Sequence, residues 1–377
     1  MKVTVDNNIK EAIRLASRFC GKGRHFPILQ AVCLQAEGAG LGVQATDMNC
    51  YLYVGLGLEA LPEEEGAVAI RGKVLADIVE RLAGAGRLAE AITIEAGGER
   101  VILSAGGRQI AVLPEDGFDP QDFPPPPGGC LDLLAEAEAE TFLSALHRLG
   151  PLASTDDDRP QLAGIAVAPR EGGLTLAASD GWRLGMVDIP GRWYGGPPVL
   201  LRRDVLKLKV KPQGNICLRG REEDILELRF WAQLGQRKAV VSLHLQALPA
   251  KAPDYKAVLA KYSPATRVVL GPDAAEDLQM AVDDLAWTFA EGRNFRIDRV
   301  DLEIGEAGIT VHGRVLDHPI PAQVDGPPTR VAVNARYLLG VLKAARTGEI
   351  RLSFGGRLDP VGVEVPDGRF LVMPLDV

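Results

Sequence analysis

The chain repeats one segment at the scale of a domain. Residues 27–47 (PILQAVCLQAEGAGLGVQATD) and 160–180 (PQLAGIAVAPREGGLTLAASD) align without a gap at an offset of 133 residues, which is 160 − 27. A weaker third copy, residues 294–313, keeps the alternating apolar positions of the second copy. One supersecondary unit used three times predicts a molecule built from three similar domains, without a single catalytic cleft.

Length and charge narrow the class of protein. At 377 residues the chain exceeds what one hydrophobic core supports, and the repeats predict domains at 1–127, 128–253 and 254–377. The apolar fraction of 46% and the charged fraction of 24% are typical of a globular protein. The net charge of −8 argues against binding nucleic acid through bulk charge, but it leaves room for a small basic surface.

Several classes of site and location are not indicated by the sequence. The N-terminal MKVTVDNNIKEAI has no apolar signal-peptide core, and no uncharged apolar run approaches about 18 residues, so we expect a cytoplasmic protein. The five cysteines are scattered without a CxxC pair, which predicts buried reduced thiols. The histidines lack metal-ligand spacing such as HExxH, and no GxxxxGK(S/T) loop is present. We therefore predict no cofactor, no metal site and no catalytic activity.

Apolar periodicity predicts the same order of elements in each repeat. A helix, a strand pair, a second helix and further strands together form an α+β domain with antiparallel sheets. Helical spacing occurs around residues 9–20, 75–82, 142–149, 204–208, 278–289 and 337–342. Alternation typical of strands occurs around 32–35, 41–45, 91–95, 101–104, 109–113 and 165–177. Asp6 is the expected N-cap of the first helix. The proline-rich stretch 116–129 predicts the first linker, and 248–264 predicts the second.

In their order and spacing, several segments resemble the bacterial DNA polymerase III β subunit, the sliding clamp, over essentially the whole chain. These segments are FPILQAVCLQAEGAGLGVQATD (26–47), LPEDGFDPQDFP (113–124), RPQLAGIAVAPREGGLTLAASDGWRL (159–184), APDYKAVL (252–259), VNARYLLGVL (333–342) and FLVMPLDV (370–377). The resemblance implies three clamp domains per chain and two chains joined head to tail in a ring. It also implies that the ring encircles duplex DNA and tethers the replicative polymerase, which raises the local concentration of polymerase at the primer end.

The resemblance further implies a DNA-facing set of basic side chains on or near the predicted helices. Such side chains meet phosphates without reading bases. By charge alone, they are also typical of ordinary solvated helix faces. The set comprises Lys10, Arg14, Arg18, Lys22, Arg24, Lys73, Arg148, Arg159, Arg202, Lys207 and Lys343.

The first helix of the third repeat departs from this basic pattern. It carries acidic residues, with no lysine or arginine before Arg293, and a duplex passing that surface would be repelled unless the carboxylates point elsewhere. The acidic residues are Asp273, Glu276, Asp277, Asp283 and Asp284. This helix favours an alternative, a clamp-like paralogue that binds clamp-ligand peptides without encircling DNA.

The resemblance also implies a peptide pocket between domains two and three. In the family, the replicative polymerase, the clamp loader and repair proteins insert short motifs with apolar and glutamine side chains into a cleft there. The matching positions here are Leu162, Ser179, Gly181, Trp182, Arg183, Leu184, Pro253, Val258, Pro360, Val372, Met373, Pro374 and Leu375. Most are apolar, as a groove for aliphatic anchors requires, although Leu162 and Leu184 taken singly fit a core position better. Trp182 stands where histidine or tyrosine is more usual, and Asp376 replaces a basic residue.

Ring closure would pair domain one with domain three of a second chain. Arg100 and Arg108 in domain one, with Glu303 and Glu306 in domain three, are candidate charge partners across that joint. All four also fit ordinary surface positions.

Overall fold

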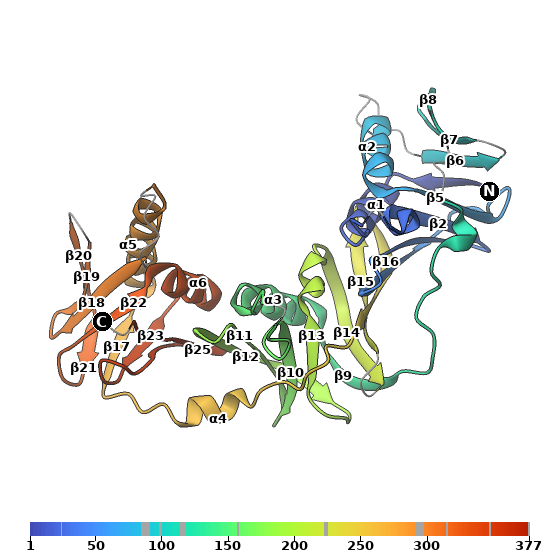
Figure 1. The fold of residues 1–377 in the computed structure, drawn as a ribbon. Coiled ribbons are helices and arrows are strands. Elements are labelled where there is room, and N and C mark those ends of the chain that lie inside the picture. The colour runs from blue at the N-terminus through green and yellow to red at the C-terminus, as the bar shows by residue number, and fades with distance from the viewer. Residues whose placement is uncertain are drawn as a thin grey trace. The chain divides into compact units, whose positions relative to one another are not determined.

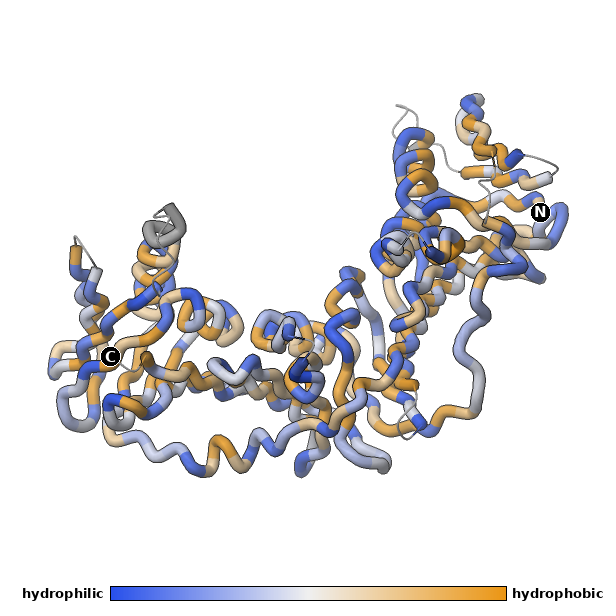
Figure 2. Tube along the Cα trace, viewed as in Figure 1, coloured by the Kyte–Doolittle hydropathy of each residue, from blue (hydrophilic) through white to orange (hydrophobic). Residues whose placement is uncertain are grey.

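The computed structural model describes residues 1–23, 25–83, 91–97, 100–113, 118–156, 158–221, 225–291, 298–313, 316–346 and 348–375, without the side chains of 83 and 287–291. The chain folds into two compact units. The first unit contains Met1–Leu143, Gly191–Gly196 and Asp204–Ala247, and the second contains Ser144–Pro190, Pro197–Arg203 and Leu248–Val377. Figure 2 shows hydrophobic and hydrophilic residues alternating along the strands and helices of each unit, as elements buried on one face require.

The first unit is built on a long antiparallel sheet with the order β5–β2–β3–β4–β16–β15–β14–β9. Its strands are β2 (Ala31–Glu37), β3 (Gly40–Thr46), β4 (Cys50–Gly57), β5 (Gly66–Arg71), β9 (Asp132–Glu138), β14 (Lys211–Arg221), β15 (Ile225–Leu234) and β16 (Arg237–Gln246). A four-stranded sheet accompanies it, formed by β1 (Lys2–Asp6), β6 (Ala91–Gly97), β7 (Arg100–Ala105) and β8 (Arg108–Val112) in that order.

Two helices cover this part of the first unit. Helices α1 (Ile9–Ser17) and α2 (Gly72–Ala83) lie side by side, as Figure 1 shows, and bury their predicted apolar stripes. The predicted N-cap Asp6 is wrong, because Asp6 is the last residue of β1 and Asn8 precedes the helix. The Asp6 carboxylate instead accepts the backbone N–H of Asn8 at 2.9 Å.

The second unit has the equivalent layout. Its long antiparallel sheet has the order β13–β10–β11–β12–β25–β24–β23–β17–β21. The strands are β10 (Gly164–Arg170), β11 (Gly173–Ser179), β12 (Arg183–Trp193, of which Gly191–Trp193 belong to the first unit), β13 (Val199–Arg202), β17 (Thr266–Leu270), β21 (Gln323–Asp325), β23 (Ile350–Phe354), β24 (Val361–Val365) and β25 (Gly368–Val372). A four-stranded sheet has the order β20 (Asp317–Pro321), β19 (Gly308–His312), β18 (Arg299–Gly305) and β22 (Thr329–Asn334).

The helices of the later repeats are α3 (Ala139–Leu149), α4 (Tyr255–Ala260), α5 (Pro272–Glu291) and α6 (Ala335–Ala345). Short 3₁₀ helices occur at η1 (Pro27–Gln30), η2 (Pro120–Asp122), η3 (Gly150–Leu152) and η4 (Arg203–Lys207). The second helix of the second repeat is therefore the 3₁₀ helix η4 rather than an α-helix. No helix among the described residues is long and apolar enough to cross a membrane.

A buried arginine links α3 to the C-terminal part of the second unit. Arg148 Nε donates to the Ala344 carbonyl oxygen at 2.8 Å, and Nη2 donates to Asp367 Oδ1 at 3.2 Å. The Arg148 side chain is 7% exposed and that of Asp367 is 53% exposed. The hydrogen bond from Arg148 lowers the pKa of the Asp367 carboxyl below its ordinary value.

The strands confirm the repeat seen in the sequence. Strands β2 and β3 begin at Ala31 and Gly40, and β10 and β11 begin at Gly164 and Gly173, which keeps the offset of 133 residues. Strands of neighbouring repeats pair directly, since β4 joins β16 and β12 joins β25. The predicted three-domain boundaries remain a prediction.

Candidate functional site

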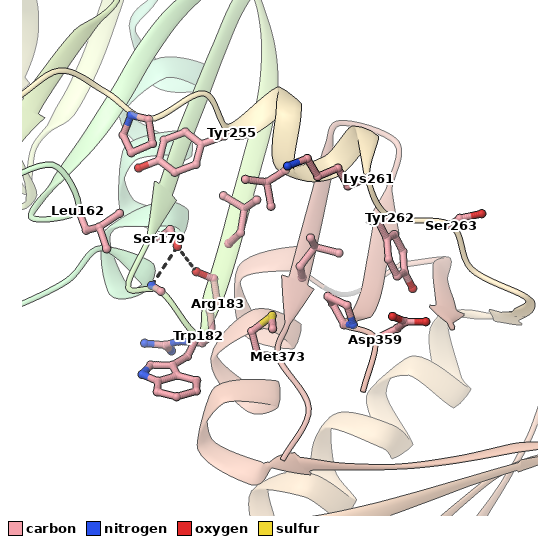
Figure 3. Close-up of a pocket in the computed structure, with 16 residues that line it drawn as sticks. Leu162, Ser179, Trp182, Arg183, Tyr255, Lys261, Tyr262, Ser263, Asp359 and Met373 are labelled. Atoms are coloured by element: carbon pink, nitrogen blue, oxygen red, sulfur yellow. Dashed lines mark hydrogen bonds between the residues drawn. The ribbon is translucent and has the colours of Figure 1, made fainter. Parts of the chain in front are cut away.

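A pocket of about 530 Å³ opens in the second unit beside the end of β11, α4 and the end of β25 (Figure 3). This volume lies in the range of ligand-binding clefts. Its lining residues are Leu162, Ser179, Gly181, Trp182, Arg183, Leu184, Pro253, Tyr255, Val258, Lys261, Tyr262, Ser263, Asp359, Pro360, Leu371 and Met373. The structure therefore brings together all the residues expected at this site except Val372, Pro374 and Leu375.

The exceptions follow from strand geometry. Successive side chains of a strand point to opposite faces, so Leu371 and Met373 reach the pocket while Val372, which is fully buried, points into the core. Beyond β25 the chain turns to β22, where Pro374 forms an isolated β-bridge and Leu375 N–H donates to a backbone carbonyl oxygen at 2.7 Å.

One wall of the pocket is a tight turn between β11 and β12. Asp180 Oδ1 accepts the backbone N–H groups of Trp182 and Arg183 at 2.9 and 2.8 Å. Ser179 Oγ donates to the Arg183 carbonyl oxygen at 2.6 Å and accepts Gly181 N–H at 3.1 Å, the two bonds drawn in Figure 3. Gly181 has a φ of 92°, which only glycine adopts without strain. These bonds fix the Trp182 backbone at the mouth of the pocket.

The first repeat contains the same turn, bond for bond. Asp47 Oδ1 accepts the N–H groups of Asn49 and Cys50, both at 3.0 Å. Thr46 Oγ1 donates to the Cys50 carbonyl oxygen and accepts Met48 N–H. Met48, which takes the place of the glycine, also has a positive φ, of 72°. The repeat thus extends to individual hydrogen bonds.

The charge of Arg183 is already satisfied within the protein. Its Nε and Nη2 donate to Asp180 Oδ2 at 2.9 and 2.7 Å, and Nη2 also donates to the Pro151 carbonyl oxygen at 3.2 Å. Its guanidinium lies 4.9 Å from the ring centroid of Tyr337. Arg183 therefore forms part of the pocket wall, and its positive charge is neutralised by Asp180 instead of being available to a ligand.

Exposed apolar side chains mark the pocket mouth. Trp182 is 55% exposed, Val258 50% and Met373 39%, and they come from three separate segments. Met373 N–H donates to the Trp182 carbonyl oxygen at 2.8 Å, which keeps two of these segments adjacent. Apolar side chains gathered around a cleft are typical of a surface that receives a partner.

Two tyrosines of the linker segment complete the floor, and the sequence interpretation missed both. Burial raises the pKa of Tyr255 to about 12, and among the described residues its hydroxyl has no hydrogen-bond partner. Tyr262 donates its hydroxyl to the Ser353 carbonyl oxygen at 2.6 Å. Tyr255 begins α4 and Tyr262 lies beyond its last residue, Ala260, so helical spacing could not have indicated both.

In the first repeat, the region equivalent to this pocket is filled by side chains of the chain itself. In the second repeat Leu184 and Tyr255 belong to one buried cluster below the open pocket. In the first repeat Tyr51 stands at the position of Leu184, and it is buried with Phe118 and Phe123 of the first linker. The Tyr51 and Phe123 rings meet edge to face with centroids 6.3 Å apart.

Comparisons with known proteins agree with this architecture. Residues 1–127 match the family model described as the DNA polymerase III beta subunit, N-terminal domain. A beta sliding clamp of Synechococcus elongatus is 24% identical over 388 residues, covering 98% of each chain. The chain thus resembles β sliding clamps along its whole length, and its residues 1–127 match the family model. The crystal structure of the Thermotoga maritima DNA polymerase III beta subunit superposes with a TM-score of 0.82 at 20% identity, covering 100% of this chain and 99% of that one. The sliding clamp of Bacillus subtilis gives 0.83 at 18% identity with the same coverage.

The basic side chains expected to face DNA from the clamp resemblance fall into two groups. Arg14, Arg18, Lys22, Lys73, Arg159 and Lys343 are exposed. On the α1–α2 surface, Lys10 and Arg14 both pair with Glu80, with Lys10 Nζ at 3.0 Å from Glu80 Oε1. The hydrogen bond from Lys10 lowers the pKa of Glu80, which is therefore charged and offsets part of the positive surface.

Other members of the basic set serve the fold. Arg148 is buried against Asp367, so we assign it a structural role instead of a DNA-facing one. Lys207 Nζ lies 3.2 Å from Asp47 Oδ2 and 2.7 Å from Asp204 Oδ1, and 5.4 Å from a phenylalanine ring centroid. Arg202, at the end of β13, is partly buried. Arg24 and Asp376 lie outside the described residues.

Asp180 allows a test of the pocket wall. Asp180→Ala removes the acceptor of two backbone N–H groups and the partner of a largely buried guanidinium, so we expect a loss of about 1–3 kcal/mol in the stability of the second unit. Asp180→Asn keeps an acceptor for the backbone groups and is expected to lose less. Thermal unfolding followed by circular dichroism measures both changes. Equal stability of wild type and Asp180→Ala contradicts this account of the turn.

Proposed function

We propose that the chain is a DNA sliding clamp, a non-catalytic processivity factor that forms a two-chain ring around duplex DNA. Its pocket binds a short peptide motif of the replicative polymerase. The clamp loader and repair proteins bind the same pocket through similar motifs. The observation that carries the proposal is the apolar pocket itself, which a rigid turn and a linker helix build at the positions expected from the clamp resemblance.

The pocket chemistry supports a peptide as its ligand. Its rim offers exposed apolar side chains, and its one arginine is internally paired, so aliphatic and aromatic anchors fit better than an anionic small molecule. Met373 is unbranched and adaptable, which suits a site that serves several partners. Lys261 and Asp359 at the opposite side could orient polar groups such as a glutamine amide.

A clamp-like paralogue that binds clamp-ligand peptides without encircling DNA is the second candidate. The feature that favours it is α5, on which Asp273, Glu276, Asp277, Asp283 and Asp284 are all exposed. Lys343 Nζ of α6 lies 3.4 Å from Asp283 Oδ1, so this lysine offsets one of the negative charges. Asp273, Glu276 and Asp277 still give this helix a negative solvent face.

The topology of DNA separates the two functions. We expect the chain, loaded by a cognate clamp loader with ATP, to stay on nicked circular plasmid and to leave after the plasmid is linearised, because a ring slides off an open end. Gel filtration of radiolabelled protein with the plasmid measures retention. The paralogue predicts no retention on either DNA, together with normal peptide binding.

A further inference from the structure

The solvent face of β15 carries an exposed tryptophan. Every second residue of β15 from Leu226 to Leu234 is buried in the core of the first unit. The intervening side chains point to the opposite face of the sheet. On that face Trp231 is 52% exposed, although β15 lies inside the long sheet between β14 and β16 (Figure 1). A large aromatic ring that stays in water in the single chain is available to stack on a ligand.

Three positively charged side chains surround Trp231 on this face. Arg229 is two residues away on the same strand. Gln233, two residues away in the other direction, pairs with Lys238 of β16 on one side and with Lys211 of β14 on the other. Paired residues point to the same face of a sheet, and diagonal neighbours are within reach of aromatic and long side chains. All three cations are exposed. Trp231 with these three cations is called the Trp231 patch below.

The positive charges of the Trp231 patch are not cancelled by neighbouring carboxylates. Among the described residues, none of the three cations forms an ion pair or a hydrogen bond. Glu227, the carboxylate next to Arg229 on this face, is 6% exposed and is held by Arg219 and Ser242. Glu136 lies two strands away, on β9. The patch is therefore a positive area on a chain whose net charge is −8.

The same face continues toward β4 and β3 as a low surface lined by glycine. Beyond Val240, the row that contains Trp231 continues with Gly55 and Gly42. A Cβ built on Gly42 or Gly55 would lie 3.0 or 3.1 Å from the Tyr53 ring, so this ring lies across both glycines. Tyr53 is partly exposed. Aromatic rings on an open sheet with cations beside them are the elements with which sheet proteins bind unpaired bases.

We propose that this face of β14, β15 and β16 binds single-stranded nucleic acid, with the Trp231 ring stacked on a base and the three cations in contact with phosphates. The inference goes beyond the proposed function, because it needs neither the ring nor the peptide pocket. Unpaired bases are favoured because the bases of a duplex stack on one another and offer no free face to the indole ring. An acidic protein segment would match the cations but would make no use of the tryptophan, and the experiments below separate the two.

The first experiment measures binding by the chain alone, without a clamp loader. Fluorescence anisotropy of a labelled oligothymidylate of about 16 nucleotides gives the dissociation constant at low salt. Trp231→Ala should weaken binding on the order of tenfold, because a stacked base is lost, and Trp231→Phe should keep most of the affinity. Phe26→Ala is the matched control, since Phe26 is 68% exposed and lies outside β14, β15 and β16, and its affinity should equal that of wild type.

The salt dependence of binding tests the cations. Arg229→Gln with Lys238→Gln should reduce the slope of log affinity against log salt concentration by about 1.4, because two phosphate contacts are lost. Lys251→Gln with Arg267→Gln removes the same charge from exposed positions of the second unit. This control should leave both the slope and the affinity unchanged.

Three results would overturn the inference. The first is an oligothymidylate that does not bind, or that binds wild type and Trp231→Ala equally. The second is unlabelled duplex DNA that competes as well as the unlabelled single strand. The third is polyglutamate that displaces the oligothymidylate at equal charge concentration with no effect of Trp231→Ala, which assigns the face to an acidic protein. Retention on circular plasmid is measured separately, so each of these results leaves the proposed clamp function standing.

Discussion

We expect replacement of Trp182 and Met373 together by alanine to lower the affinity for a motif peptide at least a hundredfold. Both side chains stand exposed at the pocket mouth, and neither takes part in the hydrogen bonds that fix the turn. Buried aromatic and apolar anchors in a cleft typically contribute about 2 kcal/mol or more each to binding. Their combined loss amounts to about 4 kcal/mol, which corresponds to a factor of several hundred to a thousand in affinity. Fluorescence anisotropy of a labelled synthetic peptide that combines glutamine with aliphatic side chains measures the change.

A matched methionine provides the control for this experiment. Met280 lies on α5, is 51% exposed and does not line the pocket. Met280→Ala should bind the peptide as tightly as wild type, and the dimer mass of the double variant should be unaltered. Undiminished peptide affinity in the double variant means that the pocket has been assigned to the wrong ligand.

Asp367→Asn is expected to destabilise the second unit by about 1–3 kcal/mol at neutral pH, because it leaves the buried Arg148 guanidinium without its counter-charge. The effect depends on pH in a defined direction. The pKa of Asp367 is lowered in the folded chain, so its contribution is complete above the ordinary aspartate pKa of 3.8 and is lost as the pH falls through the folded value. The stability difference between wild type and variant should therefore be constant near neutral pH and shrink below about pH 4. Urea unfolding at a series of pH values measures it.

An exposed ion pair supplies the comparison for this second prediction. Glu349 and Arg351 form an ion pair at 3.0 Å with both side chains more than half exposed. Glu349→Gln should cost less than about 0.5 kcal/mol at any pH. If Asp367→Asn changes the free energy of unfolding as little as Glu349→Gln does, then the ion pair of Arg148 with Asp367 does not stabilise the second unit.

Local periodicity predicted the elements well, because the signals for them are contained in the sequence. The gapless repeat located β2, β3, β10 and β11, and the apolar stripes located α2, α3, α5 and α6. Asp6 has a residue type that suits an N-cap. It belongs to β1 instead, because it pairs with β6, which is far away in the sequence. The short helical stretch predicted near 204–208 is η4, and tertiary packing decides that it is a 3₁₀ helix and not an α-helix.

The pocket was predicted in part, and the misses have separate physical causes. Val372 could have been excluded by the two-residue period of the strand, which places it opposite Leu371 and Met373. Arg148 could not have been excluded, because its burial depends on Ala344 and Asp367, which are distant in the sequence. Tyr255 and Tyr262 lie in the predicted second linker, from which only Pro253 and Val258 were expected in the pocket, and the tertiary contacts of this segment make it a wall of the site.

The burial of Phe118 and Phe123 has a consequence for the proposed binding of partner proteins. Their side chains fill the region of the first repeat that is equivalent to the pocket, while the pocket of the second repeat is open. In the proposed two-chain ring, the first two repeats of each chain would then provide one open pocket between them, in spite of their common architecture. Under the proposed function, partner proteins would exclude one another from the pocket of a given chain, and relative affinity and abundance would set the order in which they act.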